Sequence, residues 1–207
     1  MKVAVVCPRY YPFIGGVEKR VKEVSERLVR KGFEIEVLTT DPTSRLKEEE
    51  IINGVKVKRF KAWAPSDAYY FSNSLKQYLK KNSDKYDILD VHNYHALPAL
   101  YAAEAKRNNK LIFTPHFHGK GHTFFRNLLH IPYRLIGVKI FRKADLIICH
   151  SNYEKTLVME TFKITDEKIR LIPSGINPEE FKTLKKKKKD VKTILYVGRL
   201  ELSLIHI

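Results

Sequence analysis

The sequence contains little cysteine and little methionine, with two residues of each among 207. Cys7 and Cys149 are too few for a disulfide framework, and each lies inside an apolar segment. We therefore expect both to be reduced thiols in the core of a cytoplasmic protein. No apolar run reaches the roughly 18 residues that a membrane-spanning helix needs. The apolar segment Met1–Cys7 is also too short for a signal peptide.

Acidic residues are scarce relative to basic ones, 23 against 39, which gives a formal net charge of +16. Five of these positive charges form the run Lys185–Lys189, and without them the net charge is 16 − 5 = +11. The remaining basic residues are spread among acids, and no stripe of arginines and aromatics indicates a nucleic-acid surface. We therefore disfavour nucleic acid as a partner. A basic field also suits nucleotides, phosphorylated sugars and anionic membranes.

Short apolar segments alternate with longer amphipathic ones along most of the chain. Lys2–Cys7 is a continuous apolar segment of the kind that is buried on both faces of a parallel sheet. After it, Val17, Val21, Val24 and Leu28 recur at the spacing of one helical face. This alternation predicts an α/β fold of the Rossmann-like, doubly wound type, with a mostly parallel sheet and helices on both faces.

The expected elements divide the chain into three parts. Residues 1–181 form the Rossmann-like lobe, 182–192 a lysine-rich linker, and 193–207 the first strand of a truncated second lobe with a foreign tail. The polar segment Asp41–Gly54 is expected to be a loop. Strands are expected over Lys2–Cys7, Glu34–Thr39, Val55–Phe60, Asp87–Val91, Lys110–Thr114, Asp145–Cys149 and Lys168–Ile172. Helices are expected over Val17–Leu28, Ser72–Lys81, Ala96–Arg107, Phe124–Arg142 and Asn152–Phe162.

Open parallel sheets bind ligands beyond the carboxyl ends of their strands, so the segments that follow the strands hold the candidate site. Gly15 and Gly16 open a helix and would let a phosphate or sugar approach backbone N–H groups. The alternative for this pair is a tight turn. His116, two residues past a strand, could donate a hydrogen bond to a sugar hydroxyl or buffer charge near neutral pH. The alternative is a loop histidine that the backbone satisfies.

Other polar residues follow the same strand ends. They include His92, Asn93, His118, Ser151, Ser174 and Gly175. Several histidines at short spacing also suggest a metal site. We disfavour a metal, because a soft-metal site would need cysteine ligands and both cysteines lie inside strands.

The segment Lys120–Lys143 mixes bulky apolar residues with lysines and arginines. Such a helix could lie on an anionic bilayer with its apolar side down. The alternative, which we favour, is a helix that faces the core and keeps a solvated basic side.

Six segments, in this order, resemble the amino-terminal half of retaining glycosyltransferases of the two-lobed GT-B fold, of the glycosyltransferase family 4 type. The resemblance covers nearly the whole chain. The six segments are Pro12–Glu18, Asp90–Asn93, Phe113–His116, Ala144–Asn152, Ile172–Phe181 and Leu195–Leu200.

The resemblance implies the transfer of a sugar from a nucleotide-sugar donor to a glycan or lipid-linked acceptor, with retention at the anomeric carbon. This lobe would mainly hold the acceptor. Gly15 and Gly16 would approach the donor diphosphate and the bound sugar. His116 would be the catalytic histidine that contacts the sugar, with His118 as the alternate. Arg199 would stabilise the leaving diphosphate, so that no metal is expected.

The chain departs from the family pattern after Leu200. Glu201-Leu202-Ser203 replaces a basic segment, and the family's paired glutamates are missing. We therefore expect the chain to need a C-terminal lobe and to be inactive alone. A membrane-peripheral location at the inner face is compatible with its charge. The alternatives are a module that binds a glycan or an anion without catalysis, and a basic domain associated with nucleic acid.

Overall fold

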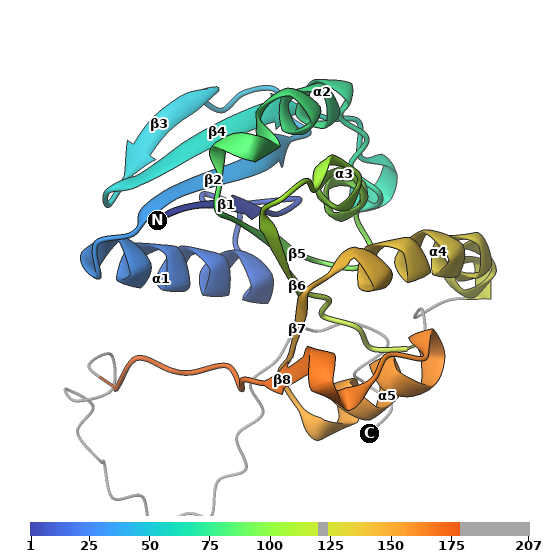
Figure 1. Ribbon diagram of the computed structural model, residues 1–207. Helices are drawn as coiled ribbons and strands as arrows, with labels where there is room; N and C mark the ends of the chain where they lie inside the picture. Colours follow the sequence, from blue (N-terminus) through green and yellow to red (C-terminus); the bar gives the residue numbers. More distant parts are fainter. Residues whose placement is uncertain (120–123, 179–207) are drawn as a thin grey trace, which may run out of the picture.

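The computed structural model describes residues 1–119 and 124–178, and Figure 1 shows how their elements are arranged. In this part of the chain, one sheet of eight strands has the order β3-β4-β2-β1-β5-β6-β7-β8. The strands are β1 (Lys2–Val6), β2 (Glu34–Asp41), β3 (Glu49–Ile52), β4 (Val55–Lys61), β5 (Ile88–His92), β6 (Lys110–Thr114), β7 (Leu146–Cys149) and β8 (Ile169–Leu171). Every neighbouring pair is parallel except β3 and β4. The predicted fold class is therefore confirmed.

The apolar first strand is buried on both faces, because successive side chains of a strand point to opposite sides of the sheet. Val3, Val5 and Cys7 belong to a core cluster on one side. Ala4 and Val6 belong to a larger cluster on the other side. A strand between two cores must be apolar at every position, which explains the continuous run in the sequence.

Helices cover both faces of the sheet (Figure 1). Helix α1 packs on the first cluster through Val21, whereas α2, α3 and α4 pack on the second. Helix α5 contacts β7 and β8. The α-helices are α1 (Gly16–Arg30), α2 (Asn73–Asn82), α3 (Leu97–Ala105), α4 (Phe124–Lys143) and α5 (Asn152–Phe162), and single 3₁₀ turns lie at Pro65–Asp67, Ser83–Lys85 and Asp166–Lys168.

One expectation was wrong. The segment 41–54, expected to be a loop, contains the strand β3, which pairs antiparallel with β4 at the sheet edge. Asn53 and Gly54 join the two strands, and both have positive φ angles of 49° and 84°. Asn-Gly is the favoured sequence of a two-residue hairpin turn, because these residues tolerate that backbone conformation. The hairpin signal was present in the sequence, but the charged residues around it suggested a loop.

Two of the three predicted parts of the chain lie outside the described residues. These are the linker over 182–192 and the further strand within 193–207, so their boundaries stay predictions. Among the helices of the described part, none is both long enough and apolar enough to cross a membrane.

Candidate active site

The predicted site residues follow strands whose carboxyl ends meet at one edge of the sheet. Strand β1 lies beside β5, β5 beside β6, and β6 beside β7, all parallel. His92, the last residue of β5, is opposite Thr114, the last residue of β6. The loops after β1, β5, β6 and β7 therefore all leave the sheet at the carboxyl-terminal ends of its strands. This is the edge at which doubly wound sheets bind their ligands.

Three imidazole rings form a row at this edge. The ring of His116 is 5.9 Å from that of His92 and 5.0 Å from that of His150, between centroids. His92 ends β5, His116 follows β6 and His150 follows β7, so the sheet spaces the three rings as it spaces its strands. His92 and His116 were predicted site residues. His150 was not, although its place directly after a strand was a usable signal.

One nitrogen of each ring is buried and has no hydrogen-bond partner among the described residues: Nδ1 of His92 and Nε2 of His116 and of His150. The second nitrogen is engaged in two of the rings. Nε2 of His92 lies 3.3 Å from Asp90, and Nδ1 of His150 lies 2.9 Å from the carbonyl of Ile172. Buried polar atoms are rarely left unpaired in proteins, so these nitrogens mark a place where a ligand can supply partners.

Burial, and to a smaller extent the neighbouring His92, His150, Arg20 and His118, together lower the pKa of His116 to about 2. The ring is therefore neutral at physiological pH, with one N–H donor and one acceptor nitrogen. Of the two uses expected for this residue, hydrogen bonding to a hydroxyl fits this environment. Buffering a charge near neutral pH does not, because the ring does not titrate there.

Glu154, a buried residue of α5, ties together the loops that carry two of these histidines. Its Oε1 accepts a hydrogen bond from the backbone N–H of Phe117 at 2.8 Å, and its Oε2 accepts one from the backbone N–H of His150 at 2.7 Å. His116, next to Phe117, has a left-handed φ of 51°. Glu154 thus fixes the loop in which His116 holds this unusual conformation.

Sequence reasoning missed Glu154. Ser151 begins α5 as its N-cap and accepts a hydrogen bond from the backbone N–H of Glu154 at 3.1 Å. Ser-x-x-Glu is the pattern of a capping box, and it would have placed both residues at a helix start. The side chain of Ser151, a predicted site residue, is engaged in this cap.

The two adjacent glycines differ in their surroundings. A Cβ at Gly15 would lie 2.1 Å from Oε2 of Glu18, whose carboxylate pairs with Nε of Arg9 at 2.9 Å. A Cβ at Gly16 would meet no atom within 4 Å. A side chain at position 15 would therefore displace the Glu18 carboxylate from its place beside Arg9. At Gly16 the packing leaves open space beside the start of α1, where a ligand could approach.

Arg20, one turn into α1, is a further residue that the sequence analysis did not single out. Its guanidinium donates a hydrogen bond of 3.1 Å to the hydroxyl of Ser174, a predicted site residue. Ser174 lies just past Ile172, the residue whose carbonyl contacts His150. The segment after β8 thus links the start of α1 to the row of histidines, which brings these predicted residues to one place.

The remaining predicted residues lie in the loops of the same edge. Asn93 has a positive φ of 75° and accepts a hydrogen bond from the backbone N–H of His95, which is a local turn contact. His118 and Gly175 are exposed. Arg199 lies outside the described residues. Among those described, no three histidine, cysteine or acidic side chains are grouped so that they could hold a metal ion.

A comparison with models of protein families gives the class of this protein. The family model described as "Glycosyltransferase Family 4" matches residues 14–180. The chain therefore belongs to glycosyltransferase family 4, which confirms the family that the sequence resembles.

Individual relatives are distant. The chain is 23% identical, over 212 residues, to the phosphatidylinositol N-acetylglucosaminyltransferase GPI3 subunit of Saccharomyces cerevisiae, covering 96% of this chain and 46% of the relative. The chain spans about half the length of the curated relatives it matches.

Solved structures share the fold. Sucrose-phosphate synthase of Thermosynechococcus elongatus has a TM-score of 0.66 at 17% identity, covering 86% of this chain and 49% of that one. HepE of Anabaena, solved with UDP and glucose, has a TM-score of 0.60 at 16% identity, covering 86% of this chain and 46% of that one.

Proposed function

We propose that the chain is the N-terminal, acceptor-holding lobe of a retaining glycosyltransferase. The complete enzyme would move a hexose from a nucleotide-sugar to a glycan or lipid-linked acceptor. The observation that carries the proposal is the buried, unpartnered Nε2 of His116 at the same sheet edge as the open space beside Gly16. Family membership gives the reaction class, and the HepE structure holds UDP and glucose.

In this proposal the neutral ring of His116 hydrogen-bonds a hydroxyl of the transferred sugar and so fixes the orientation of its anomeric carbon. His92 would contact the same sugar, with Asn93, His118, Ser151, Ser174 and Gly175 around the acceptor. The N–H groups at the start of α1 would approach the donor diphosphate where Gly16 leaves room. Arg199 would add positive charge beside the leaving nucleotide.

The test is turnover by the intact protein with a panel of nucleotide-sugars, compared between wild type and His116→Ala. Loss of a sugar hydrogen bond in the transition state should lower kcat/KM about a hundredfold. Arg30→Ala, which changes an exposed residue at the far end of α1, outside the site, is the control. Unchanged activity in His116→Ala removes this residue from the site. The 207-residue chain alone should show no turnover.

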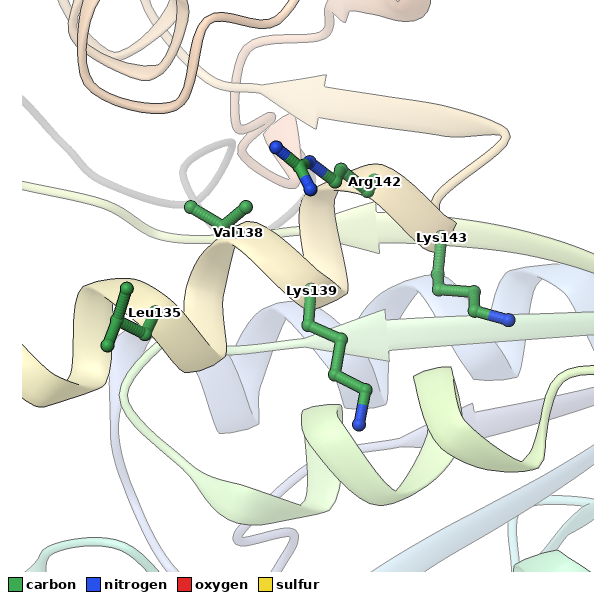
Figure 2. A pocket seen from close by; sticks show the side chains of 5 residues that line it. All are labelled: Leu135, Val138, Lys139, Arg142 and Lys143. Carbon is green, nitrogen blue, oxygen red and sulfur yellow. The ribbon is translucent and has the colours of Figure 1, made fainter.

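We further propose that α4 contacts an anionic membrane surface, where a lipid-linked acceptor would reside. The second half of α4 buries Tyr133, Ile140 and Phe141, so the preference for a core-facing helix with a basic side fits this part of the helix. Yet Leu135 stays 77% exposed. It lines a shallow hollow of about 660 Å³ together with Val138, Lys139, Arg142 and Lys143 (Figure 2). An apolar residue surrounded by cations suits the boundary of an anionic bilayer.

Sedimentation with vesicles tests this contact. Wild type should bind phosphatidylcholine vesicles that contain phosphatidylserine more strongly than pure phosphatidylcholine, and Arg142→Glu should weaken that binding severalfold. Lys85→Glu makes the same change of charge at an exposed lysine outside α4. Equal binding by both variants would exclude α4 as the contact. Salt-sensitive binding of random oligonucleotides that survives Gly16→Ala would instead favour the nucleic-acid alternative.

A further inference from the structure

Arg20 is a half-buried cation at the candidate site, and residues 1–119 and 124–178 provide no nearby counter-ion for it. Within the described residues, its guanidinium has no carboxylate within 4 Å, and its hydrogen bond goes to the neutral hydroxyl of Ser174. Burial lowers the pKa of Arg20, whereas Asp90 and Glu154 raise it from a greater distance. An arginine carries five N–H donors, so most of them remain available here.

The carboxylates around Arg20 are already engaged with other groups. Both oxygens of Glu154 accept backbone N–H groups, from Phe117 and from His150. Asp90 lies beside the Nε2 of His92 at 3.3 Å. Neither acid can turn to Arg20 without leaving a buried group unpaired, so none of the acids in the described part of the chain neutralises this guanidinium.

The other polar groups near Arg20 favour an acceptor-rich ligand over a cation. Arg20 lies close enough to His116 to lower its pKa, and the Ser174 segment joins Arg20 to the histidine row. The start of α1, one turn away from Arg20, is a positive helix end whose first N–H groups have no partner within the helix. Gly16 leaves that helix end uncovered.

From this geometry we infer that Arg20 is the anchor of an anion site that takes a phosphate group of the enzyme's substrate. A phosphate offers several acceptor oxygens in the arrangement that the planar guanidinium fork matches. It would complete the hydrogen bonds of Arg20 and could accept from a histidine N–H on the same side. The inference deepens the proposed function, because a phosphate of the acceptor or of the nucleotide-sugar could occupy the site.

Calorimetric titration of this chain with inorganic phosphate, at constant ionic strength, tests the anion site. Wild type should show saturable binding, and Arg20→Ala should weaken it about tenfold, as loss of a charge-assisted hydrogen bond predicts. Arg30→Ala removes the same charge from the exposed far end of α1 and should leave the affinity unchanged. If Arg20→Ala fails to fold, Arg20→Gln takes its place: it can keep the bond to Ser174 without the charge and should bind phosphate about tenfold more weakly than wild type.

Absence of saturable binding in wild type, or equal affinity in wild type and Arg20→Gln, would overturn the inference. Glycerol 1-phosphate and UDP then identify the source of the phosphate. If the site serves the acceptor, Arg20→Gln weakens the binding of glycerol phosphate and both ligands bind together. If the site serves the donor, Arg20→Gln weakens the binding of UDP more than that of glycerol phosphate, and UDP displaces glycerol phosphate from wild type. These measurements need no turnover, so failure of the glycosyltransferase proposal would be seen separately, as an intact protein that transfers no sugar.

Discussion

Two arginines near the start of α1 differ in whether a carboxylate pairs with their charge. Arg9 pairs with Glu18 at 2.9 Å, lies 3.6 Å from Asp67 and covers the ring of Phe13. Arg20 has one neutral hydrogen-bond partner and no carboxylate within 4 Å among the described residues. Nothing in the sequence distinguishes these two arginines. They differ in the groups that surround each guanidinium in the folded chain.

The same contrast separates the Glu18 carboxylate from the row of histidines. In the loop before α1, the carboxylate of Glu18 fills the space that Gly15 leaves, and its charge is paired. In the row of His92, His116 and His150, each ring has a buried nitrogen without a partner in the described chain. A buried polar group that the protein satisfies contributes to stability, and one that it leaves unsatisfied is available to a ligand. The predictions below test this division, from the largest expected effect to the smallest.

Glu154→Ala should be the most destabilising change at the site. It leaves the buried N–H groups of Phe117 and His150 without acceptors, which should lower the free energy of unfolding by about 3 kcal/mol. Urea unfolding measures this loss. Glu160→Ala, on an exposed position of the same helix, should stay within about 0.5 kcal/mol of wild type. Similar losses in both variants would mean that Glu154 does not hold the loops.

Gly15→Ala should cost about 2 kcal/mol of stability, because the new Cβ overlaps the Glu18 carboxylate and displaces it from Arg9. Thermal and urea unfolding both report the effect. In a Glu18→Ala background the same substitution should cost much less, since the overlapping group is gone. An undiminished cost in that background would show that the Glu18 contact is not the reason for glycine here.

His116 should make stability depend on pH. Its folded-state pKa is lowered to about 2, so the unfolded chain binds an extra proton below the ordinary histidine pKa of about 6.5. Stability is therefore full above that value and falls as the pH drops, by about 1.4 kcal/mol per pH unit. Urea unfolding at pH 6.5 and 5.0 should show this slope in wild type and a flatter one in His116→Gln. If the free energy of unfolding changes equally with pH in both proteins, the His116 ring is solvated and titrates in the folded state.

Gly16→Ala should change stability least, by less than about 1 kcal/mol, because the added methyl group enters open space at the first turn of a helix. Its effect should fall on ligands: nucleotide-sugar turnover by the intact protein should drop while the unfolding midpoint stays near that of wild type. A loss of stability as large as that of Gly15→Ala would end the distinction between the two glycines.

The arrangement of the elements could be predicted from the sequence because it depends on local patterns. Continuous apolar runs such as 2–7 and the helical spacing from Val17 to Leu28 allow few other structures, and their alternation predicts a parallel sheet. That sheet brings the segments after its strands to one edge, so Gly16, His92 and His116 could be named in advance. The hairpin at Asn53-Gly54 was equally local, and its turn signal was outweighed by the charged residues around it.

What only the tertiary structure decided is which polar groups are already satisfied. Arg9 and Arg20 differ because Glu18 lies beside one, whereas the acids near the other bind backbone N–H groups and a histidine. The pKa of His116 depends on burial and on neighbouring residues from β5, from α1 and from two loops. Sequence patterns are set by contacts between residues a few positions apart. Desolvation and pairing are set by groups up to 154 positions apart, as for Arg20 and Ser174, and these meet only in the folded chain.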